Sequence, residues 1–141
     1  MLFRSSLDVT IDDRLIELDM GKFTGMAYDE IFNEHGNVFM KFYQGDLEIA
    51  HNGVETFDQV KKRVLGIVDH VLEKHPDQNI VLVTHMDPIK AMLSTVVDLS
   101  PTNLFELIIA NASLNLFREN KRKFSISGLN VMHPTRFDQG W

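Results

Sequence analysis

The sequence predicts an α/β domain in which helices alternate with strands and a hairpin comes last. Three observations support this fold class. Residues 80–83 form an uninterrupted aliphatic run, short enough for a strand that is buried on both faces. Residues 57–71 repeat apolar side chains with the period of an amphipathic helix. Residues 113–118 and 123–127 have the pattern of two strands joined by a short polar connection, which is typical of an antiparallel hairpin.

The composition limits the classes of function. The 141 residues are enough for one domain spanning 1–141, and 44% hydrophobic with 24% charged residues is ordinary for a globular protein. A net charge of −6 without a basic block argues against a nucleic acid or an acidic membrane surface as partner. No cysteine is present, which excludes disulfides and a cysteine nucleophile and fits a cytoplasmic location. No stretch has the pattern of a signal peptide or a membrane span.

The first part of the chain contains a loop and a helix. Alternating apolar and polar residues over 7–11 predict a short, half-exposed strand. Residues 13–25 carry two glycines in a polar stretch and are expected to form an ordered loop. A helix is predicted over 26–35, with Gly36 as its C-terminal stop. Residues 37–53 are interpreted as a covering segment that is partly helical.

The strongest helix signal comes next. Thr56, with Gln59 three residues later, forms a capping-box pattern, and Pro76 and Asp77 end the predicted helix. Its buried face is expected to consist of the apolar residues at helical spacing: Phe57, Val60, Val64, Ile67, Val68 and Val71.

The aliphatic run leads into a histidine. Asp87 and Pro88 are expected to be the N-cap and the first residue of the following helix. His85 would then lie at the carboxyl end of a parallel strand, beside a helix N-terminus, where α/β proteins bind anions. The alternative is a histidine that only hydrogen-bonds a neighbouring loop. The apolar face of the helix is predicted to consist of Ile89, Met92, Leu93, Val96 and Val97.

The last part of the chain is predicted to be mostly strands. Residues 100–103 are expected to form a turn, and 105–110 a strand that precedes the hairpin. Residues 128–141 are interpreted as a mostly irregular tail.

Common catalytic motifs are absent from the sequence. It contains no G-x-S-x-G elbow, no P-loop and no G-x-G-x-x-G fingerprint. His70, Glu73 and His75 are close together but not in the order H-E-x-x-H, so neither a metal nor a cofactor is expected. Two candidates remain, Glu17 in a glycine-flanked loop and His85 at the predicted strand end. Other acidic residues compete with Glu17, and each of them alone is more often a surface charge: Asp12, Asp13 and Asp19.

Four stretches match the motifs of one family in order and spacing. Residues 14–25 look like its loop bearing a proton-donor glutamate, and residues 53–63 like its "GES…R" helix start. Residues 81–85, followed by Ile89-Lys90, look like its strand with the second catalytic histidine. Asn111-Ala-Ser113 and Asn130 with His133 look like its closing strand and "N…H" end. From Asp12 to His133 the chain therefore resembles the histidine phosphatase superfamily, which includes the cofactor-dependent phosphoglycerate mutases.

The resemblance implies a fold and a chemistry. The fold is a phosphoglycerate mutase-like three-layer αβα sandwich with a mixed, mostly parallel sheet. The chemistry is phosphoryl transfer through a phosphohistidine, with a phosphatase or mutase outcome. By position, Glu17 is the acid/base and His85 the second histidine. Their side chains are expected to face the same cleft at the carboxyl edge of the sheet, no more than about 10 Å apart. His85 and the backbone of Met86 would bind the phosphate group of a small substrate or inorganic phosphate.

The sequence also departs from the family. It contains no Arg-His dipeptide, so the nucleophilic histidine has no counterpart. Met86 stands where the family usually has glycine, and the negative charge of Asp87 would oppose phosphate unless it caps the helix. We therefore expect an N-terminally truncated phosphatase or mutase that is inactive alone. The alternatives are a non-catalytic module that binds a phosphate ligand or a partner, and a structural core in which neighbours satisfy His85.

The missing block is expected to affect assembly. In the family, its strand pairs with the counterpart of residues 80–83, so one edge of that strand would keep unpaired N–H and C=O groups here. Each such group costs about 1–3 kcal/mol when buried. We expect the chain to form a homo-oligomer through this sheet edge, to borrow a segment such as 1–11, or to rearrange the sheet.

Overall fold

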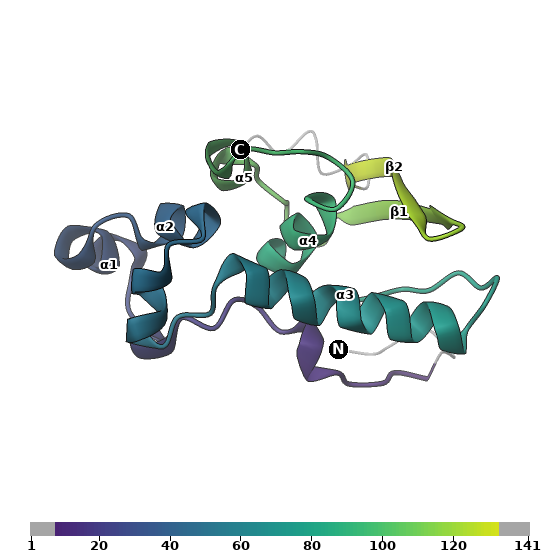
Figure 1. The fold of residues 1–141 in the computed structure, drawn as a ribbon, viewed down its shortest axis with the longest axis horizontal. Coiled ribbons are helices and arrows are strands. Elements are labelled where there is room, and N and C mark those ends of the chain that lie inside the picture. The colour runs from purple at the N-terminus through teal and green to yellow at the C-terminus, as the bar shows by residue number, and fades with distance from the viewer. Residues whose placement is uncertain (1–7, 133–141) are drawn as a thin grey trace.

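The computed structural model describes residues 8–132 and consists of short helices around one long helix, with a hairpin at the end (Figure 1). The long helix α3 packs against η1 on one side and α4 on the other, and α2 packs against α5. The α-helices are α1 (Tyr28–His35), α2 (Val38–Gln44), α3 (Phe57–Lys74), α4 (Met86–Leu93) and α5 (Pro101–Glu106). The 3-10 helices are η1 (Asp13–Leu15), η2 (Gly21–Phe23) and η3 (Leu47–Asn52), and the strands are β1 (Leu114–Asn120) and β2 (Lys123–Val131).

Helix α3 forms where its caps and apolar period predict it. The Thr56 hydroxyl accepts a hydrogen bond from the Gln59 amide at 3.3 Å, and the Gln59 side chain accepts one from the Thr56 amide at 2.7 Å. The predicted face is buried from Phe57 to Val68, whereas Val71 is only partly buried. The helix ends at Lys74, just before the predicted stop at Pro76.

The helical structure predicted within residues 26–53 is confirmed. Helix α1 begins at Tyr28 and ends at His35, with Gly36 as its C-cap at a positive φ of 72°. Residues 37–53 are indeed partly helical, since they contain α2 and η3. Phe42 of α2 packs edge-on against Phe57, with 5.4 Å between ring centroids, so this covering segment closes the core over the start of α3.

The predicted buried strand at 80–83 is not formed. Val81 and Val83 are 76% and 85% exposed, and within residues 8–132 the only sheet is the β1–β2 hairpin. A strand buried on both faces needs a hydrogen-bonded neighbour and covering layers, and no other described segment supplies that neighbour. The segment therefore runs extended with its valines outward. The parallel part of the predicted sheet is thus missing from the described part of the chain.

The predicted strand at 7–11 is also wrong where it can be seen. Residues 8–12 form no strand, and Val9 and Ile11 are exposed because no other described segment pairs with them. Leu7 lies outside the described residues.

Helix α4 is shifted from its predicted bounds. It begins at Met86 with His85 as N-cap, so Asp87 lies in the first turn and does not cap the helix. It ends at Leu93, and Val96 and Val97 follow in a turn. The apolar period continues past the point where the helical backbone stops, and this is why the sequence predicted a longer helix.

Residues 100–110 differ from the prediction as well. The predicted turn at 100–103 is the start of α5: the Ser100 hydroxyl accepts a hydrogen bond from the Asn103 amide at 3.1 Å, and Pro101 is the first helical residue. The predicted strand at 105–110 is replaced by the end of α5 and an extended segment that belongs to no strand.

The antiparallel hairpin is confirmed. Asn120 pairs with Lys123, and the two connecting residues, Lys121 and Arg122, both have positive φ, as a type I′ turn requires. Strand β2 continues to Val131, four residues into the segment predicted as irregular, while 133–141 lie outside the described residues.

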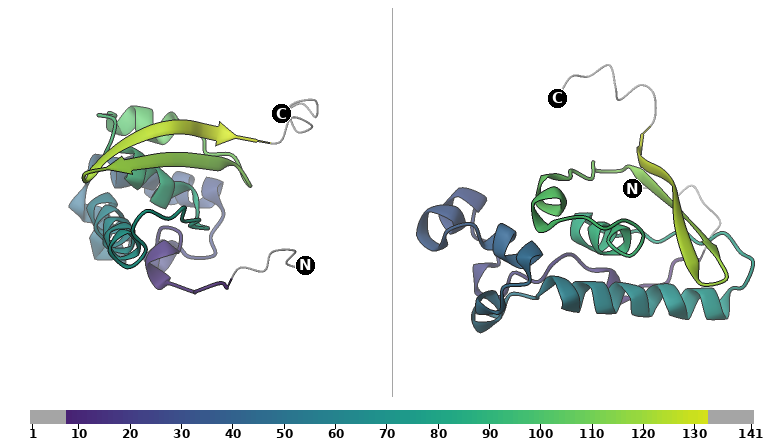
Figure 2. Two further views of the ribbon diagram at one scale, coloured as in Figure 1. Left: turned by 90° about the vertical axis from the view of Figure 1, so that its right-hand side faces the viewer. Right: turned by 45° about the horizontal axis from the view of Figure 1, so that its top comes forward.

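Figure 2 shows the hairpin turn reaching the C-terminal end of α3. There, Arg122 pairs with Asp69 at 3.0 Å and with Glu73 at 3.4 Å. Among residues 8–132, no helix combines the length and the apolar character needed to cross a bilayer.

Candidate active site

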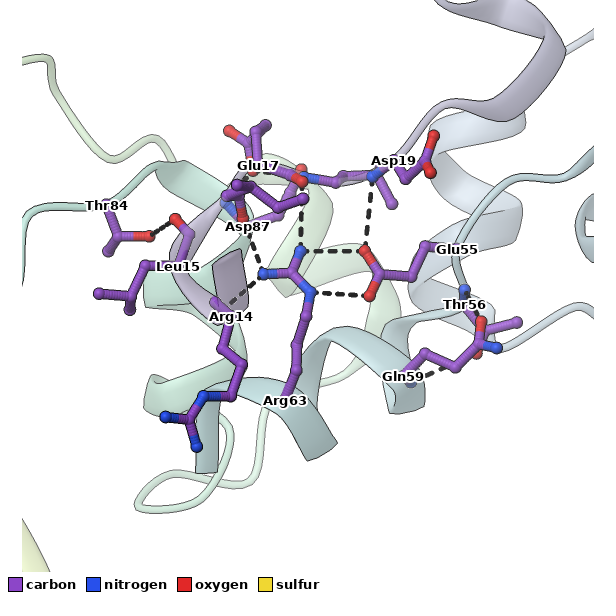
Figure 3. A network of polar contacts seen from close by, with 12 residues as sticks. Arg14, Leu15, Glu17, Asp19, Glu55, Thr56, Gln59, Arg63, Thr84 and Asp87 are labelled. Atoms are coloured by element: carbon purple, nitrogen blue, oxygen red, sulfur yellow. Dashed lines mark hydrogen bonds and ion pairs between the residues drawn. The ribbon is translucent and has the colours of Figure 1, made fainter. Parts of the chain in front are cut away.

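Arg63 of α3 fixes the path of the segment that carries Glu17 (Figure 3). Its Nη1 donates to the carbonyl oxygens of Arg14 and Ile16, both at 2.8 Å, and its Nη2 donates to that of Glu17 at 3.2 Å. Its Nε and Nη2 also donate to the Glu55 carboxylate at 2.7 and 2.9 Å. All five N–H donors of the guanidinium are therefore used within the chain, so Arg63 holds the loop and has no donor left for a ligand.

The segment of residues 16–26, called here the Glu17 loop, is also held from the segment before α3. The Glu55 amide donates to the Asp19 carbonyl at 2.9 Å. Gly21 has a φ of 52°, and a Cβ there would lie 2.3 Å from the carbonyl carbon of Gly53. Because only glycine fits this close approach, Gly21 is a structural requirement of the loop.

Glu17 contacts the first turn of α4. Its Oε1 accepts hydrogen bonds from the amide of Leu18 at 3.0 Å and from the amide of Asp87 at 3.2 Å, although Asp87 is seventy residues away in the sequence. A carboxylate at a helix N-terminus is favoured by the unpaired amides and by the helix dipole. The fold thus brings Glu17 to the helix that His85 begins.

His85 and Met86 lie at the exposed start of α4. His85 is the N-cap, and its side chain makes no capping hydrogen bond. The preceding residue, Thr84, donates from its hydroxyl to the Leu15 carbonyl at 2.6 Å, which ties the residues just before α4 to the same segment that Arg63 holds. His85 and Met86 are both exposed. The catalytic role of His85, and the phosphate-binding role of His85 and Met86, remain predictions.

A buried polar chain lies behind this helix start. The Tyr43 hydroxyl donates to the Asp87 carboxylate, and the Lys90 ammonium donates to the Tyr43 oxygen at 2.9 Å. Lys90 is only 1% exposed, and its Nζ also lies 4.7 Å from the centroid of the Tyr43 ring. The negative charge of Asp87 is thus directed into the protein, toward a cation, and does not cap the helix as predicted.

Burial dominates the pKa values in this chain of three residues. Burial raises the pKa of Asp87, against the opposing effect of its hydrogen bond from Tyr43. Burial also lowers the pKa of Lys90, with Asp87 acting in the opposite direction. Burial, followed by the nearby Asp87 charge, raises the pKa of Tyr43 far above its usual range, so Tyr43 remains a hydrogen-bond donor.

Tyr43 and Lys90 are not among the candidate site residues predicted from the sequence. A signal for Lys90 was present, because a lysine three residues after Asp87 falls on the apolar, core-facing side of a helix, where a charged residue requires a partner. Nothing in the local sequence pointed to Tyr43, which lies on another helix.

The residues weighed against Glu17 have local structural roles. Asp12 caps η1 and pairs with Arg14 at 2.6 Å, and these hydrogen bonds lower the pKa of Asp12 to about 2. Asp19 accepts from the Gly21 amide at 2.9 Å, and Asp13 is an exposed residue of η1. Glu73, weighed as a metal ligand, pairs with Arg122.

A pocket of about 390 Å³ opens beside the Glu17 loop. The loop forms one side, and α1 with the start of α2 forms the other. Its lining is mostly apolar and includes Glu17 and Asp19 together with Met20, Met26, Tyr28, Ile31 and Phe39.

Comparison with known proteins gives one family. The model of the histidine phosphatase superfamily (branch 1) matches residues 2–132. Phosphoserine phosphatase 1 of Hydrogenobacter thermophilus is 27% identical over 126 residues, which cover 89% of this chain and 60% of that protein. The 2,3-bisphosphoglycerate-dependent phosphoglycerate mutase of Thermoplasma acidophilum is 33% identical over 111 residues, which cover 77% of this chain and 50% of that protein. The chain thus spans between 50% and 60% of the length of these two relatives.

Solved structures agree on the fold. Bacillus stearothermophilus YhfR superposes with a TM-score of 0.74 at 23% identity, covering 86% of this chain and 61% of that one. A mycobacterial glucosyl-3-phosphoglycerate phosphatase superposes with a TM-score of 0.75 at 23% identity, covering 92% and 66%. These similarities confirm the predicted α/β, phosphoglycerate mutase-like fold. With a family match across nearly the whole chain, this protein belongs to the histidine phosphatase superfamily.

Proposed function

We propose that this chain supplies the acid/base and the phosphate-binding half of a histidine-phosphatase site that acts on a small phosphomonoester. One contact carries the proposal: Glu17 Oε1 lies 3.2 Å from the amide nitrogen of Asp87, in the first turn of the helix that His85 begins. The matched acid and the matched histidine thus come from distant stretches to one helix end. The phosphatases and the mutase among the relatives support a phosphorylated substrate.

Each group has a role in this proposal. Glu17 gives its proton to the leaving oxygen as the P–O bond breaks and the phosphoryl group passes to the family's nucleophilic histidine, for which these 141 residues have no Arg-His counterpart. Glu17 then takes a proton from the water that attacks the phosphohistidine. The His85 side chain and the Met86 amide hold the non-bridging oxygens, at a helix end whose dipole favours anions. Asp87 does not oppose the phosphate strongly, because its carboxylate is buried against Tyr43 and faces the Lys90 side.

We further propose that the chain alone binds phosphate without turning over a substrate. The family accepts the phosphoryl group on a histidine of an Arg-His-Gly motif, and no Arg-His pair occurs in the 141 residues. Removing a catalytic nucleophile costs on the order of 10⁶ in rate.

The second candidate is a non-catalytic module that binds a partner. The extended segment 80–83 favours it, because Val81 and Val83 are exposed and the segment belongs to no strand. We propose a second copy of this chain as the partner, paired antiparallel through this segment, since an extended segment with outward valines matches itself under a two-fold axis. The lack of cysteine supports a cytoplasmic location as part of the same proposal.

A titration and an assay test the main proposal. In ¹H–¹⁵N spectra of the full chain, inorganic phosphate should shift the Met86 and Asp87 amides saturably, and His85→Ala should weaken binding about tenfold or more. The matched control is His75→Ala, because His75 is also an exposed histidine but is the C-cap of α3. This variant should leave binding unchanged.

The assay follows hydrolysis of p-nitrophenyl phosphate by the purified chain, and no turnover above buffer is expected. Turnover that His85→Ala abolishes would refute the predicted inactivity. If added phosphate does not shift the amide signals of Met86 and Asp87, the proposal of a phosphate site there is refuted.

A further inference from the structure

The pocket beside Glu17 carries charges of one sign. Two carboxylates, Glu17 and Asp19, belong to the lining, and among the described residues that form it there is no lysine, arginine or histidine. Lys22 lies within the same loop but is exposed and does not belong to the lining, although its Nζ is 5.3 Å from the centroid of the Phe23 ring, which does line the pocket. A carboxylate on the ligand would meet repulsion from Glu17 and Asp19, and no cation of the lining would pair with it.

An aromatic stack forms the outer wall of this pocket. The rings of Tyr28 and Phe39 lie 5.2 Å apart at an angle of 24°, and Tyr28 continues the stack to Phe32 at 6.2 Å and 18°. Tyr28 and Phe32 are 49% and 48% exposed, an unusual surface position for two large rings on one helix. Tyr28 and Phe39 line the pocket, whereas Phe32 does not.

The pocket also shares a residue with the proposed site. Glu17 lines it and contacts the α4 start, so a molecule in the pocket lies next to the group that protonates the leaving oxygen. The pocket is therefore placed to hold the leaving group of a phosphomonoester, which is the part bonded to that oxygen.

We propose that this pocket binds the leaving group and selects a flat, apolar group without negative charge, such as an aryl ring. This inference rests on the proposed function. The proposed substrate class differs from phosphoglycerate, for which some of the relatives are named, because the leaving group of phosphoglycerate carries a carboxylate. The Tyr28–Phe39 stack gives a flat ring an apolar face, and the acidic lining excludes an anion.

Binding by the full chain tests the proposal without requiring turnover. Four probes are titrated and followed by ¹H–¹⁵N shifts: inorganic phosphate, phenyl phosphate, 3-phosphoglycerate and phenol. Phenyl phosphate should bind about tenfold more tightly than inorganic phosphate and 3-phosphoglycerate, and should shift the Tyr28 and Phe39 amides as well as Met86.

Two alanine variants of α1 give a matched pair. Tyr28→Ala should reduce the affinity for phenyl phosphate to that for inorganic phosphate. Phe32→Ala removes an equally exposed ring that does not line the pocket, and should leave both affinities unchanged. Asp19→Asn keeps the acceptor for the Gly21 amide and should strengthen binding of 3-phosphoglycerate alone. Circular dichroism of each variant shows whether the helices are intact.

The outcomes separate the two proposals. If phenyl phosphate and inorganic phosphate bind equally and shift only the α4 start, the pocket proposal is overturned and the proposed function stands. If 3-phosphoglycerate binds as tightly as phenyl phosphate, the proposed exclusion of anionic leaving groups is overturned. If inorganic phosphate does not bind, the proposed function fails. The phenol titration then tests the pocket by itself: shifts of the Tyr28 and Phe39 amides support an aryl-binding site, and the absence of these shifts overturns it.

Discussion

Arg63 and Glu55 form a two-point ion pair on the side of α3 that faces the Glu17 loop. The distances are 2.7 Å from Nε to Oε1 and 2.9 Å from Nη2 to Oε2, and both side chains are 15% exposed. The same guanidinium holds the backbone carbonyls of Ile16 and Glu17 in the loop and that of Arg14 just before it. Breaking the Arg63–Glu55 pair would therefore affect both the stability of α3 and the position of Glu17.

Replacing Arg63 by lysine should therefore destabilise the protein. Lysine keeps the charge but cannot make the fork to Glu55 and reach the three carbonyls as well. We expect the free energy of unfolding to fall by about 2–4 kcal/mol, as for other poorly exposed pairs. Urea denaturation measures the change. The matched control is Arg122→Lys, whose surface pairs with Asp69 and Glu73 should contribute less than about 1 kcal/mol. Equal losses in the two variants would contradict this prediction.

The stability of the protein should depend on the ionisation of Asp87. Its pKa is raised in the folded state from an ordinary value of 3.8, so between that value and the raised one the folded state binds more protons than the unfolded state. The contribution of Asp87 to the free energy of unfolding must then fall as the pH rises through this window.

The variant Asp87→Asn isolates this effect, because asparagine can still accept the Tyr43 hydrogen bond but does not titrate. The free energy of unfolding of the wild type minus that of the variant should decline from pH 3.8 upward and then level off. A difference that rises with pH would mean that Lys90 stabilises the charged carboxylate more than burial opposes it.

Glu17→Gln should strengthen phosphate binding. In the proposed site the Glu17 carboxylate lies near the bound anion, and glutamine removes its charge while keeping an oxygen for the amides of Leu18 and Asp87. A gain of about fivefold corresponds to roughly 1 kcal/mol, the size of one charge pair in a solvated site. The gain should shrink at high salt. Asp19→Asn is the control and should leave the affinity for inorganic phosphate unchanged, and an equal gain there would argue against a specific position for Glu17.

The extended segment 80–83 should mediate self-association. Light scattering should show a dimer that Val83→Lys converts to a monomer, because a charged side chain on a strand edge disfavours pairing. Val9→Lys replaces another exposed valine outside this segment and should leave the dimer intact. Hydrogen exchange gives a second measurement: the amides of residues 80–83 should be protected in the dimer and exchange quickly in the monomer. A stable monomer in the wild type would overturn the proposal.

Some elements could be predicted because their causes are local. The capping box of Thr56 and Gln59 and the apolar period after it define α3, and the polar connection before Lys123 separates the hairpin strands. Glu17 and His85 became candidates through the order of the motifs, since no local pattern marks either residue as catalytic.

Other features depend on partners that the local sequence does not contain. Residues 80–83 have the composition of a buried strand, but burial requires neighbours on both sides, and no other described segment pairs with them. The bond from Tyr43 to Asp87 joins residues forty-four positions apart, and the aromatic stack of Tyr28 and Phe39 joins two different helices. Contacts of this kind follow from the tertiary fold and from no periodic pattern.

The three carbonyl contacts of Arg63 have a consequence for how this loop can vary. Because the acceptors are main-chain oxygens, the guanidinium fixes where the chain runs at Ile16 and Glu17 without contacting the Ile16 side chain through these hydrogen bonds. Ile16, exposed and at the edge of the pocket, is therefore open to substitution without moving Glu17. A library randomised at this position would diversify ligand preference over an unchanged acid/base, which makes the loop a natural starting point for engineering new selectivity.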